Sequence, residues 1–358
     1  MGYERKGIAQ MHGYVPGKQP ANAQTIKLNT NENPYPPSPA VMQVLTAVEP
    51  DWLRRYPEPM AEAFRAQAAR VHGVRAEEIV ATNGGDELLR MAITTFVEPG
   101  APIGVLEPSY SLYPVLAEIH GSPVVRVNAH ADFGTPSDFA ARMNDAGVSL
   151  SLLVNPHAPS GKLTGRDEIA KIARELKGVL LVDEAYIDFV DPRLGHDLLP
   201  LIHEHDNLLF LRTLSKGYSL AGLRFGYGIG AESLIAPLLG KTRDSYNVDA
   251  IAQRLATAAL ADRAYAQDTW LRVREERKRV RDALLELRFE VPESQSNFLL
   301  AKLPAHRLNA PALQQELEAR GVLVRYFAQD RLEQSLRITI GTPEQNDKLL
   351  GLLRVLLA

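Results

Sequence analysis

The feature that most constrains the fold is a regular alternation of short apolar runs and amphipathic segments between about residue 60 and residue 245. The apolar runs are rich in Val, Ile and Leu, as buried strands are, whereas segments such as 87–96, 111–120 and 167–176 repeat apolar residues at helical spacing. This alternation predicts an α/β fold in which a mostly parallel sheet is covered by helices on both faces. The expected strands comprise residues 79–80, 102–106, 124–127, 148–154, 179–182, 208–211 and 225–229.

The pattern changes near residue 245, which indicates a second domain. Two long helical patterns, 250–261 and 268–287, lead into short strands and helices, so we expect a large domain over 38–245 and a smaller α+β domain over 246–358. Residues 1–37 are polar and proline-rich, cannot bury much surface alone, and are expected to wrap another surface as an arm. The smaller domain is expected to contain strands 298–302, 322–325 and 336–340 and helices 311–320 and 343–357.

Composition and charge exclude several classes of protein. The net charge of −3 gives no electrostatic reason to expect nucleic acid or an anionic membrane as a partner. Cysteine is absent, which excludes disulfides and thiolate chemistry and fits a reducing compartment. The N-terminus lacks the apolar core of a signal peptide, and no stretch reaches about 18 uninterrupted apolar residues. We therefore expect a cytoplasmic protein with no nucleic-acid or membrane partner.

A lysine follows one of the expected strands, in the segment RTLSKGYSLAGLRFG. Ligands of parallel α/β sheets bind at the carboxyl ends of the strands, and Lys216 would lie just past the strand 208–211. A lysine alone at such a position is typical of a surface. A partly desolvated lysine, however, is an amine nucleophile that forms a Schiff base with a carbonyl. Thr213, Ser215 and Arg224 supply the hydroxyls and the guanidinium that suit a phosphate dianion.

Three further strand ends carry polar groups. In LVDEAY, Asp183 would keep a pyridine nitrogen protonated if the cofactor has such a ring, and Tyr186 can donate to a ring oxygen. In LVNPHAPSG, Asn155 is a hydrogen-bond donor at a strand end. In TNGGDELL, glycines free the backbone N–H groups of Thr82 to Glu87 at a helix N-terminus, where phosphate binds. Each pattern alone is typical of a turn or a cap, but the four together describe one pyridine-phosphate ligand.

These motifs resemble those of the fold-type I pyridoxal-phosphate aminotransferases, and within them the histidinol-phosphate aminotransferases. The resemblance covers nearly the whole chain, including GYVPG, LNTNENPYPP, RYPEP, EPSYSLY, SNF, GVLVR and LRITIGT besides the four segments above. It implies a ping-pong transamination of L-histidinol phosphate with 2-oxoglutarate, giving imidazole acetol phosphate and L-glutamate in histidine biosynthesis. It also implies pyridoxal 5'-phosphate as the cofactor and a homodimer whose subunits share their active sites.

The resemblance implies roles for individual residues. Lys216 would form the Schiff base and move the substrate proton, Asp183 would pair with the pyridine nitrogen, and Tyr186 would hold the phenolic oxygen of the cofactor. Arg325 would meet the substrate phosphate and Arg337 the carboxylate of glutamate. The other expected cofactor-binding residues are Gly85, Asp86, Glu87, Tyr110 (stacked on the ring), Asn155, Thr213, Ser215, Arg224 and, from the partner subunit, Tyr56. The arm would close the pocket with Tyr14 and Asn31.

One turn departs from the family's pattern, because NPHAPSG stands where Asn-Pro-Asn-Asn-Pro-Thr-Gly is usual. Asn155 and both prolines are kept, so cofactor binding is expected to be intact. We interpret His157 as a surface turn residue, and its effect on substrate preference stays open. The charged run 272–281 is interpreted as a solvated helix face.

Several alternatives remain. The chain could be an aromatic amino-acid aminotransferase or a threonine-phosphate decarboxylase on a similar scaffold. It could also be a ligand-binding protein on an inactive scaffold, although Lys216, Asp183 and Arg224 argue against that. His203 and His205 have no third ligand at a fitting spacing, so no metal site is expected.

Overall fold

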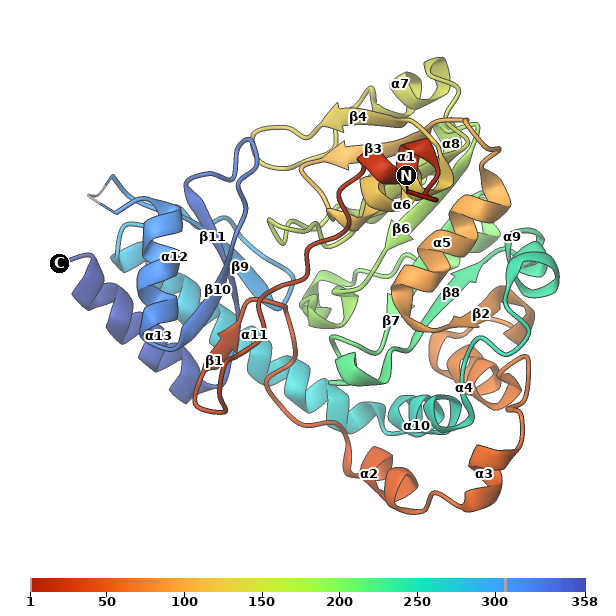
Figure 1. Ribbon diagram of the computed structural model, residues 1–358, viewed down its shortest axis with the longest axis horizontal. Helices are drawn as coiled ribbons and strands as arrows, with labels where there is room; N and C mark the ends of the chain where they lie inside the picture. The colour runs from red at the N-terminus through yellow and green to blue at the C-terminus, as the bar shows by residue number, and fades with distance from the viewer. Residues whose placement is uncertain (1, 306–307) are drawn as a thin grey trace.

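The computed structural model describes residues 2–305 and 308–358, and its larger sheet has seven strands (Figure 1). The strands are β2 (Ile79–Thr82), β3 (Ile103–Glu107), β4 (Val124–Asn128), β5 (Leu150–Val154), β6 (Val179–Asp183), β7 (Leu208–Thr213) and β8 (Gly226–Gly230). They lie in the order β2-β8-β7-β6-β5-β3-β4, and β8 runs opposite to the other six strands of this sheet. The predicted α/β fold with a mostly parallel sheet is confirmed, and β2 to β7 all end at the same edge.

Helices cover both faces of this sheet, as the sequence predicts. Successive residues of a strand are buried on opposite faces of the sheet. Leu180 and Val182 of β6 belong to one hydrophobic core, whereas Leu181 belongs to the other. The first core includes residues of α4 (Glu62–His72), α7 (Phe139–Asp145) and α8 (Arg166–Glu175), and the second those of α5 (Gly84–Phe96), α6 (Leu112–His120) and α9 (Glu232–Pro237). Within the described part of the chain, no helix is both long and apolar enough to cross a membrane.

A smaller, four-stranded sheet lies beside the larger one (Figure 1). Its strands are β1 (Ile26–Leu28), β9 (Phe298–Lys302), β10 (Val322–Tyr326) and β11 (Ser335–Thr339), in the order β1-β10-β11-β9. The long helix α11 (Arg263–Glu286) packs along β9, and α12 (Ala310–Ala319) packs on β10. The remaining helices are α1 (Lys6–Gln10), α2 (Pro39–Thr46), α3 (Pro50–Arg54), α10 (Ala250–Ala261) and α13 (Pro343–Leu356).

Polar side chains at the helix starts explain why the sequence pattern located the C-terminal helices well. The carboxylate of Asp249 accepts a hydrogen bond from the third backbone N–H of α10, and the side chain of Asn309 does the same for α12. At α13, Thr342 and Gln345 form a reciprocal capping box. These caps satisfy N–H groups that have no partner inside the helix, so each helix begins at a defined residue.

The N-terminal arm contributes a strand that the sequence pattern did not reveal. β1 runs parallel to β10, with Ile26 opposite Val322 and Leu28 opposite Val324. Leu28 is 1% exposed and Asn31 is equally buried, so this segment is part of the core between the sheets as well as a wrapping arm. The domain boundaries at residues 37 and 245 stay a proposal.

The charged run on α11 is not solvated throughout. Arg277 falls on the buried helical stripe that includes Val273 and Val280, and its guanidinium is largely shielded. Its Nη1 donates to the carbonyl oxygens of Phe189 at 3.0 Å and Ser296 at 2.7 Å. Helical periodicity therefore overrides charge at this position, and the interpretation of the whole run as a solvated face was wrong for Arg277.

Candidate functional site

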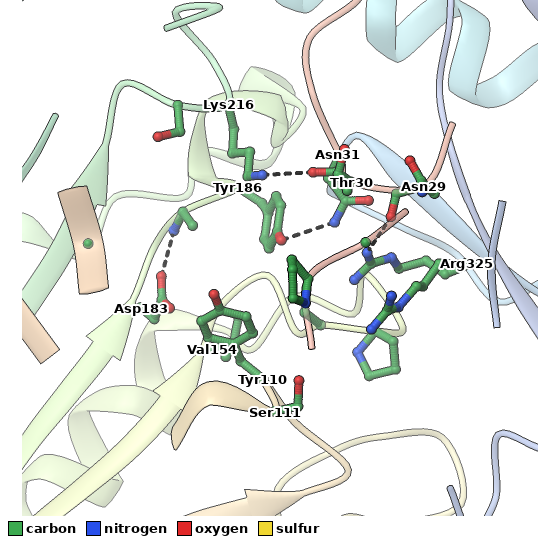
Figure 2. A pocket seen from close by; sticks show the side chains of 18 of the residues that line it. Asn29, Thr30, Asn31, Tyr110, Ser111, Val154, Asp183, Tyr186, Lys216 and Arg325 are labelled. Carbon is green, nitrogen blue, oxygen red and sulfur yellow. Dashed lines mark hydrogen bonds between the residues drawn. The ribbon is translucent and has the colours of Figure 1, made fainter. Parts of the chain in front are cut away.

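A pocket of about 280 Å³ lies between the two sheets, at the edge where the parallel strands end. Its walls come from the larger sheet, from the N-terminal arm and from β10 and β11 (Figure 2). Of the site residues predicted from the sequence, all but Glu87, Asn155 and Tyr56 line this pocket. The topology thus gathers side chains that are more than 300 positions apart in the chain, such as Tyr14 and Arg337.

Lys216 enters the pocket from the loop that follows β7. Its Nζ donates to the carbonyl oxygen of Thr30 in the arm at 2.9 Å (Figure 2). Burial and, to a smaller extent, the positive charge of Arg337 lower the pKa of the Lys216 amine to about 8. A lysine with this pKa is neutral in part near neutral pH, and the neutral amine is the form that attacks a carbonyl carbon.

Asp183 is the last residue of β6 and is 5% exposed. The hydroxyl of Tyr113 donates to its Oδ2 at 2.9 Å, and the backbone N–H of Ala185 donates to Oδ1 at 3.0 Å. Burial raises the pKa of Asp183 to about 6, although both hydrogen bonds act in the opposite direction. Such a carboxylate is poised to share a proton with a ring nitrogen. Tyr113 belongs to the EPSYSLY motif, but no role for it was predicted from the sequence.

Backbone and side-chain donors for a phosphate converge at the start of α5. Gly85 and Asp86 belong to the first turn of this helix, and the hydroxyls of Thr213 and Ser215 lie 2.9 Å apart across from it in the pocket lining. The guanidinium of Arg224 is 3.6 Å from Asp86. A helix N-terminus with two hydroxyls and a guanidinium has the composition of a phosphate site.

This arrangement requires a glycine at the start of β8. A Cβ atom on Gly226 would lie 2.7 Å from the backbone of Gly84 and Gly85, closer than such atoms approach. The absence of a side chain lets β8 pass directly against the first turn of α5. The "GLRFG" segment therefore places Arg224 beside the helix terminus.

Two arginines face each other across neighbouring strands of the smaller sheet. Arg325 of β10 and Arg337 of β11 are directly paired in register, and both line the pocket. Arg337 donates from Nη2 to the carbonyl oxygen of Asn29 at 3.1 Å, whereas its buried Nε has no hydrogen-bond partner. Like charges directly opposite each other destabilise a sheet, and an unpartnered buried N–H costs free energy. The two guanidinium groups therefore favour the binding of an anion beside them.

Residues of the arm close the pocket over the aromatic side chains of the larger sheet. Tyr14 packs edge-on against Tyr110, with ring centroids 5.9 Å apart. Asn31 donates from Nδ2 to the hydroxyl of Tyr186 at 3.0 Å (Figure 2). These contacts place the arm between the pocket and solvent, although Tyr14 itself is 39% exposed.

Three predicted cofactor-binding residues lie elsewhere. The carboxylate of Glu87 turns back to the N–H of Asn83 and the amide of Asn247, because it caps its own helix. Asn155 stands beside the pocket, but its amide pairs with the backbone N–H and carbonyl of Thr164. The expected contacts of both side chains with the cofactor stay predictions.

Tyr56 lies on the surface, outside the pocket of its own chain. It is 81% exposed and stacks on Tyr246, with ring centroids 4.4 Å apart.

The interpretation of His157 as a surface residue was wrong. Its side chain is 2% exposed because the chain folds inward after β5. One ring nitrogen lies 2.8 Å from the hydroxyl of Ser160, and the other lies 2.8 Å from the carbonyl oxygen of Pro108. Spacing in the sequence gives no signal for these two contacts.

The pocket fits pyridoxal phosphate on its own chemistry. It combines an amine of lowered pKa, a buried carboxylate, a phosphate-type donor set and the aromatic ring of Tyr110. The unpartnered Nε of Arg337 also favours the binding of an anionic substrate group. Among the described residues, no cluster of His, Cys, Asp or Glu could hold a metal ion.

The sheet order and the lysine at the strand ends define a fold-type I transferase. The sequence profile of the family "Aminotransferase class I and II" matches residues 23–353. The chain belongs to this aminotransferase family, which confirms the resemblance seen in its motifs.

Curated relatives and solved structures agree with this assignment. The chain is 42% identical over 356 residues to histidinol-phosphate aminotransferase 1 of Trichormus variabilis, with 99% of each chain covered. The histidinol-phosphate aminotransferase of Sinorhizobium meliloti, solved in complex with pyridoxal-5'-phosphate, superimposes with a TM-score of 0.89 at 24% identity and 99% coverage of both chains. L-threonine-O-3-phosphate decarboxylase of Porphyromonas gingivalis has the same fold, with a TM-score of 0.78, 23% identity and coverage of 93% and 99%. The fold alone therefore does not select the reaction.

Proposed function

We propose that the chain is a pyridoxal-phosphate-dependent aminotransferase that transfers the amino group of L-histidinol phosphate to 2-oxoglutarate. The observation that carries the proposal is the pair Arg325 and Arg337, which lie opposite each other in the strand register and line the same pocket as Lys216. The 42% identity to a histidinol-phosphate aminotransferase over the whole chain supports the same substrate.

Pyridoxal phosphate, when bound, supplies an aldehyde and a ring that withdraws electrons from the substrate α-carbon. In this proposal Lys216 is the nucleophilic amine. It would then take the proton from the substrate α-carbon and return it to the carbon of the cofactor aldehyde. Asp183 keeps a proton on the ring nitrogen. The carboxylate suits this task because Tyr113 and Ala185 orient both of its oxygens.

The two half-reactions need one site that accepts two different anions. Histidinol phosphate has a phosphate and no carboxylate, whereas glutamate has two carboxylates. Guanidinium groups bind both kinds of anion through paired hydrogen bonds, so a pocket with Arg325 for the phosphate and Arg337 for the carboxylate of glutamate can accept both substrates. Tyr14 and Asn31 of the arm exclude water from the pocket meanwhile.

A homodimer completes the proposal. Leu53 and Tyr56 are 68% and 81% exposed, and together with Trp52 they line a shallow groove on the surface. Exposed apolar and aromatic side chains in one groove are typical of an interface. Tyr56 would then reach the phosphate site of the partner subunit. The cytoplasmic location expected from the sequence stays a prediction.

The test compares kcat/KM for L-histidinol phosphate, phenylalanine and tyrosine, each with 2-oxoglutarate. Two charge-assisted hydrogen bonds to phosphate predict a preference of about a hundredfold or more for the phosphate ester. Equal values would favour an aromatic aminotransferase. Release of CO₂ from threonine phosphate would favour the decarboxylase, and cofactor binding without turnover would favour an inactive scaffold.

A further inference from the structure

The side chain of His157 joins two loops that meet at the pocket. One loop, 155–164, follows β5, and the other, 108–111, follows β3 and carries Tyr110. The ring of His157 lies 2.8 Å from Ser160 Oγ in its own loop and 2.8 Å from the carbonyl oxygen of Pro108 in the other. The side chain is thus a cross-link between two walls of the same site.

The hydrogen-bond partners fix the tautomer of this ring. A carbonyl oxygen only accepts, so Nε2 must donate its proton to Pro108. Nδ1 of the neutral ring is then the acceptor for the hydroxyl of Ser160, whose oxygen also accepts from the N–H of Lys162 at 3.2 Å. Burial lowers the pKa of His157 to about 4, in accord with a neutral ring. Every polar atom of the cross-link therefore has one defined role.

The bond to Pro108 acts close to Tyr110. The carbonyl of Pro108 belongs to the peptide group that continues into Ser109, one residue before the tyrosine. Tyr110 in turn accepts at its backbone carbonyl from the N–H of Tyr113 at 3.1 Å, at the start of α6. The short segment between Pro108 and α6 is therefore held at both ends, and the His157 bond holds the end at Pro108.

The other side of the ring is also supported. Phe133 packs against His157, with ring centroids 5.7 Å apart and planes 30° apart. The guanidinium of Arg331 lies 5.1 Å from the centre of the Phe133 ring and donates to the carbonyl oxygens of Ala129 and His130 at 2.8 and 2.7 Å. His157 thus cannot swing away from Pro108 without disturbing this stack.

We propose that His157 is a positioning residue for the cofactor: its Nε2–H, bonded to the carbonyl of Pro108, holds Tyr110 against the cofactor ring. The proposal rests on the proposed function, since it assumes that pyridoxal phosphate binds beside Tyr110. It also gives the departure NPHAPSG a role in the site.

Three variants separate this role from a general effect on folding. His157→Asn shortens the side chain, so that its amide reaches Ser160 but not Pro108. His157→Gln places an amide nitrogen near the position of Nε2 and keeps the donor to Pro108. Ser160→Ala removes the bond to Nδ1 and leaves the bond to Pro108, so it controls for lost stability at the same buried site.

The measurement is the Kd of pyridoxal phosphate for each cofactor-free variant, from fluorescence titration, beside its free energy of unfolding in urea. We expect His157→Asn to raise the Kd about tenfold, from the loss of one buried hydrogen bond, and His157→Gln to change it less than about threefold. Ser160→Ala should destabilise the chain as much as His157→Asn does, yet leave the Kd within about twofold of wild type. A Kd that follows stability in all three variants would overturn the proposal.

A double-mutant cycle tests whether the effect passes through Tyr110. In a Tyr110→Ala background, His157→Asn should raise the Kd by less than about twofold, because no ring is left to position. An undiminished tenfold effect in that background would overturn the proposal. Phe133→Leu, which removes no hydrogen bond, gives a milder test should His157→Asn not fold: we expect a Kd about threefold higher, and an unchanged Kd would contradict the role.

The same titration distinguishes failure of the two proposals. A wild-type chain that binds no pyridoxal phosphate would overturn the proposed function and the role of His157 with it. Wild-type binding with equal losses in His157→Asn and His157→Gln would overturn the role of His157 alone.

Discussion

Replacing Arg337 by methionine should separate substrate binding from stability. The guanidinium lies opposite Arg325 in the strand register, its Nε is buried without a partner, and burial lowers its pKa. Methionine keeps much of the apolar volume of the side chain and removes the charge. We therefore expect Arg337→Met to abolish most of the activity with glutamate while the cofactor-free chain stays folded.

The expected magnitudes follow from the contacts. A paired interaction of a guanidinium with a carboxylate provides two charge-assisted hydrogen bonds of about 1.5–3 kcal/mol each, which predicts a loss of about 10²–10⁴ in kcat/KM. In the cofactor-free chain, the variant loses one bond to Asn29 and two cation–π contacts, with Phe298 and Phe327. It also relieves the repulsion from Arg325 and the desolvated Nε. These contributions are each about 1 kcal/mol and opposite in sign, so the free energy of unfolding should change by no more than about 1 kcal/mol.

The assay measures kcat/KM for glutamate in the reverse half-reaction and the free energy of unfolding in urea on the cofactor-free chain. Arg320→Met serves as a control, because Arg320 directly follows α12, forms an ion pair with Glu316 and does not line the pocket. A loss of activity below about fivefold would refute the role of Arg337 in binding a carboxylate. A loss of stability above about 2 kcal/mol would refute the reasoning that its charge is uncompensated.

Three other substitutions test the rest of the site. Lys216→Ala should abolish turnover while light scattering gives the same molecular mass as for wild type, and full activity in this variant would contradict the assignment of the nucleophile. Because burial raises the folded-state pKa of Asp183 to about 6, its contribution to stability is present below the unfolded value near 3.8 and is lost as the pH rises through 6. Over this pH interval, the free energy of unfolding of the cofactor-free chain in urea should therefore fall by roughly 3 kcal/mol less in Asp183→Asn than in wild type. Parallel pH profiles of the two proteins would count against the raised pKa. Arg325→Ala should raise the KM for L-histidinol phosphate far more than that for glutamate, whereas equal increases would contradict its assignment to the phosphate.

Local signals were sufficient for the regular elements. The strand β9 and the helix α10 have the bounds that periodicity predicts, and the strands of the larger sheet differ from the prediction by one or two residues at their ends. Parallel strands align their carboxyl ends, so polar residues after several strands had to meet at one edge. That single topological rule placed Lys216, Asp183 and Thr213 in one pocket before any distance was known.

Local sequence patterns do not predict contacts between segments that are distant in the chain. β1 is a strand because β10 offers it a partner, and the alternation of apolar Ile26 and Leu28 around Lys27 is too short to predict a strand. His157 is buried because Pro108 and Phe133 surround it, which no local pattern encodes. Glu87 follows the glycines of a phosphate-binding turn in sequence, yet its side chain reaches back to Asn83 and caps the helix.

The uncompensated arginines also connect substrate binding to the chemistry of the lysine. The charge of Arg337 is one of the causes that lower the pKa of Lys216 to about 8 in the empty pocket, which favours the neutral, nucleophilic amine. An anionic substrate group bound to Arg337 cancels much of that charge, and the amine then becomes a stronger base. In the proposed function this change suits both tasks of the residue: the lowered pKa of Lys216 favours attack on the cofactor aldehyde, and a higher pKa favours uptake of the substrate α-proton once the anion is bound. The charge of Arg337 therefore helps to prepare the lysine in this proposal, as well as to attract an anionic substrate.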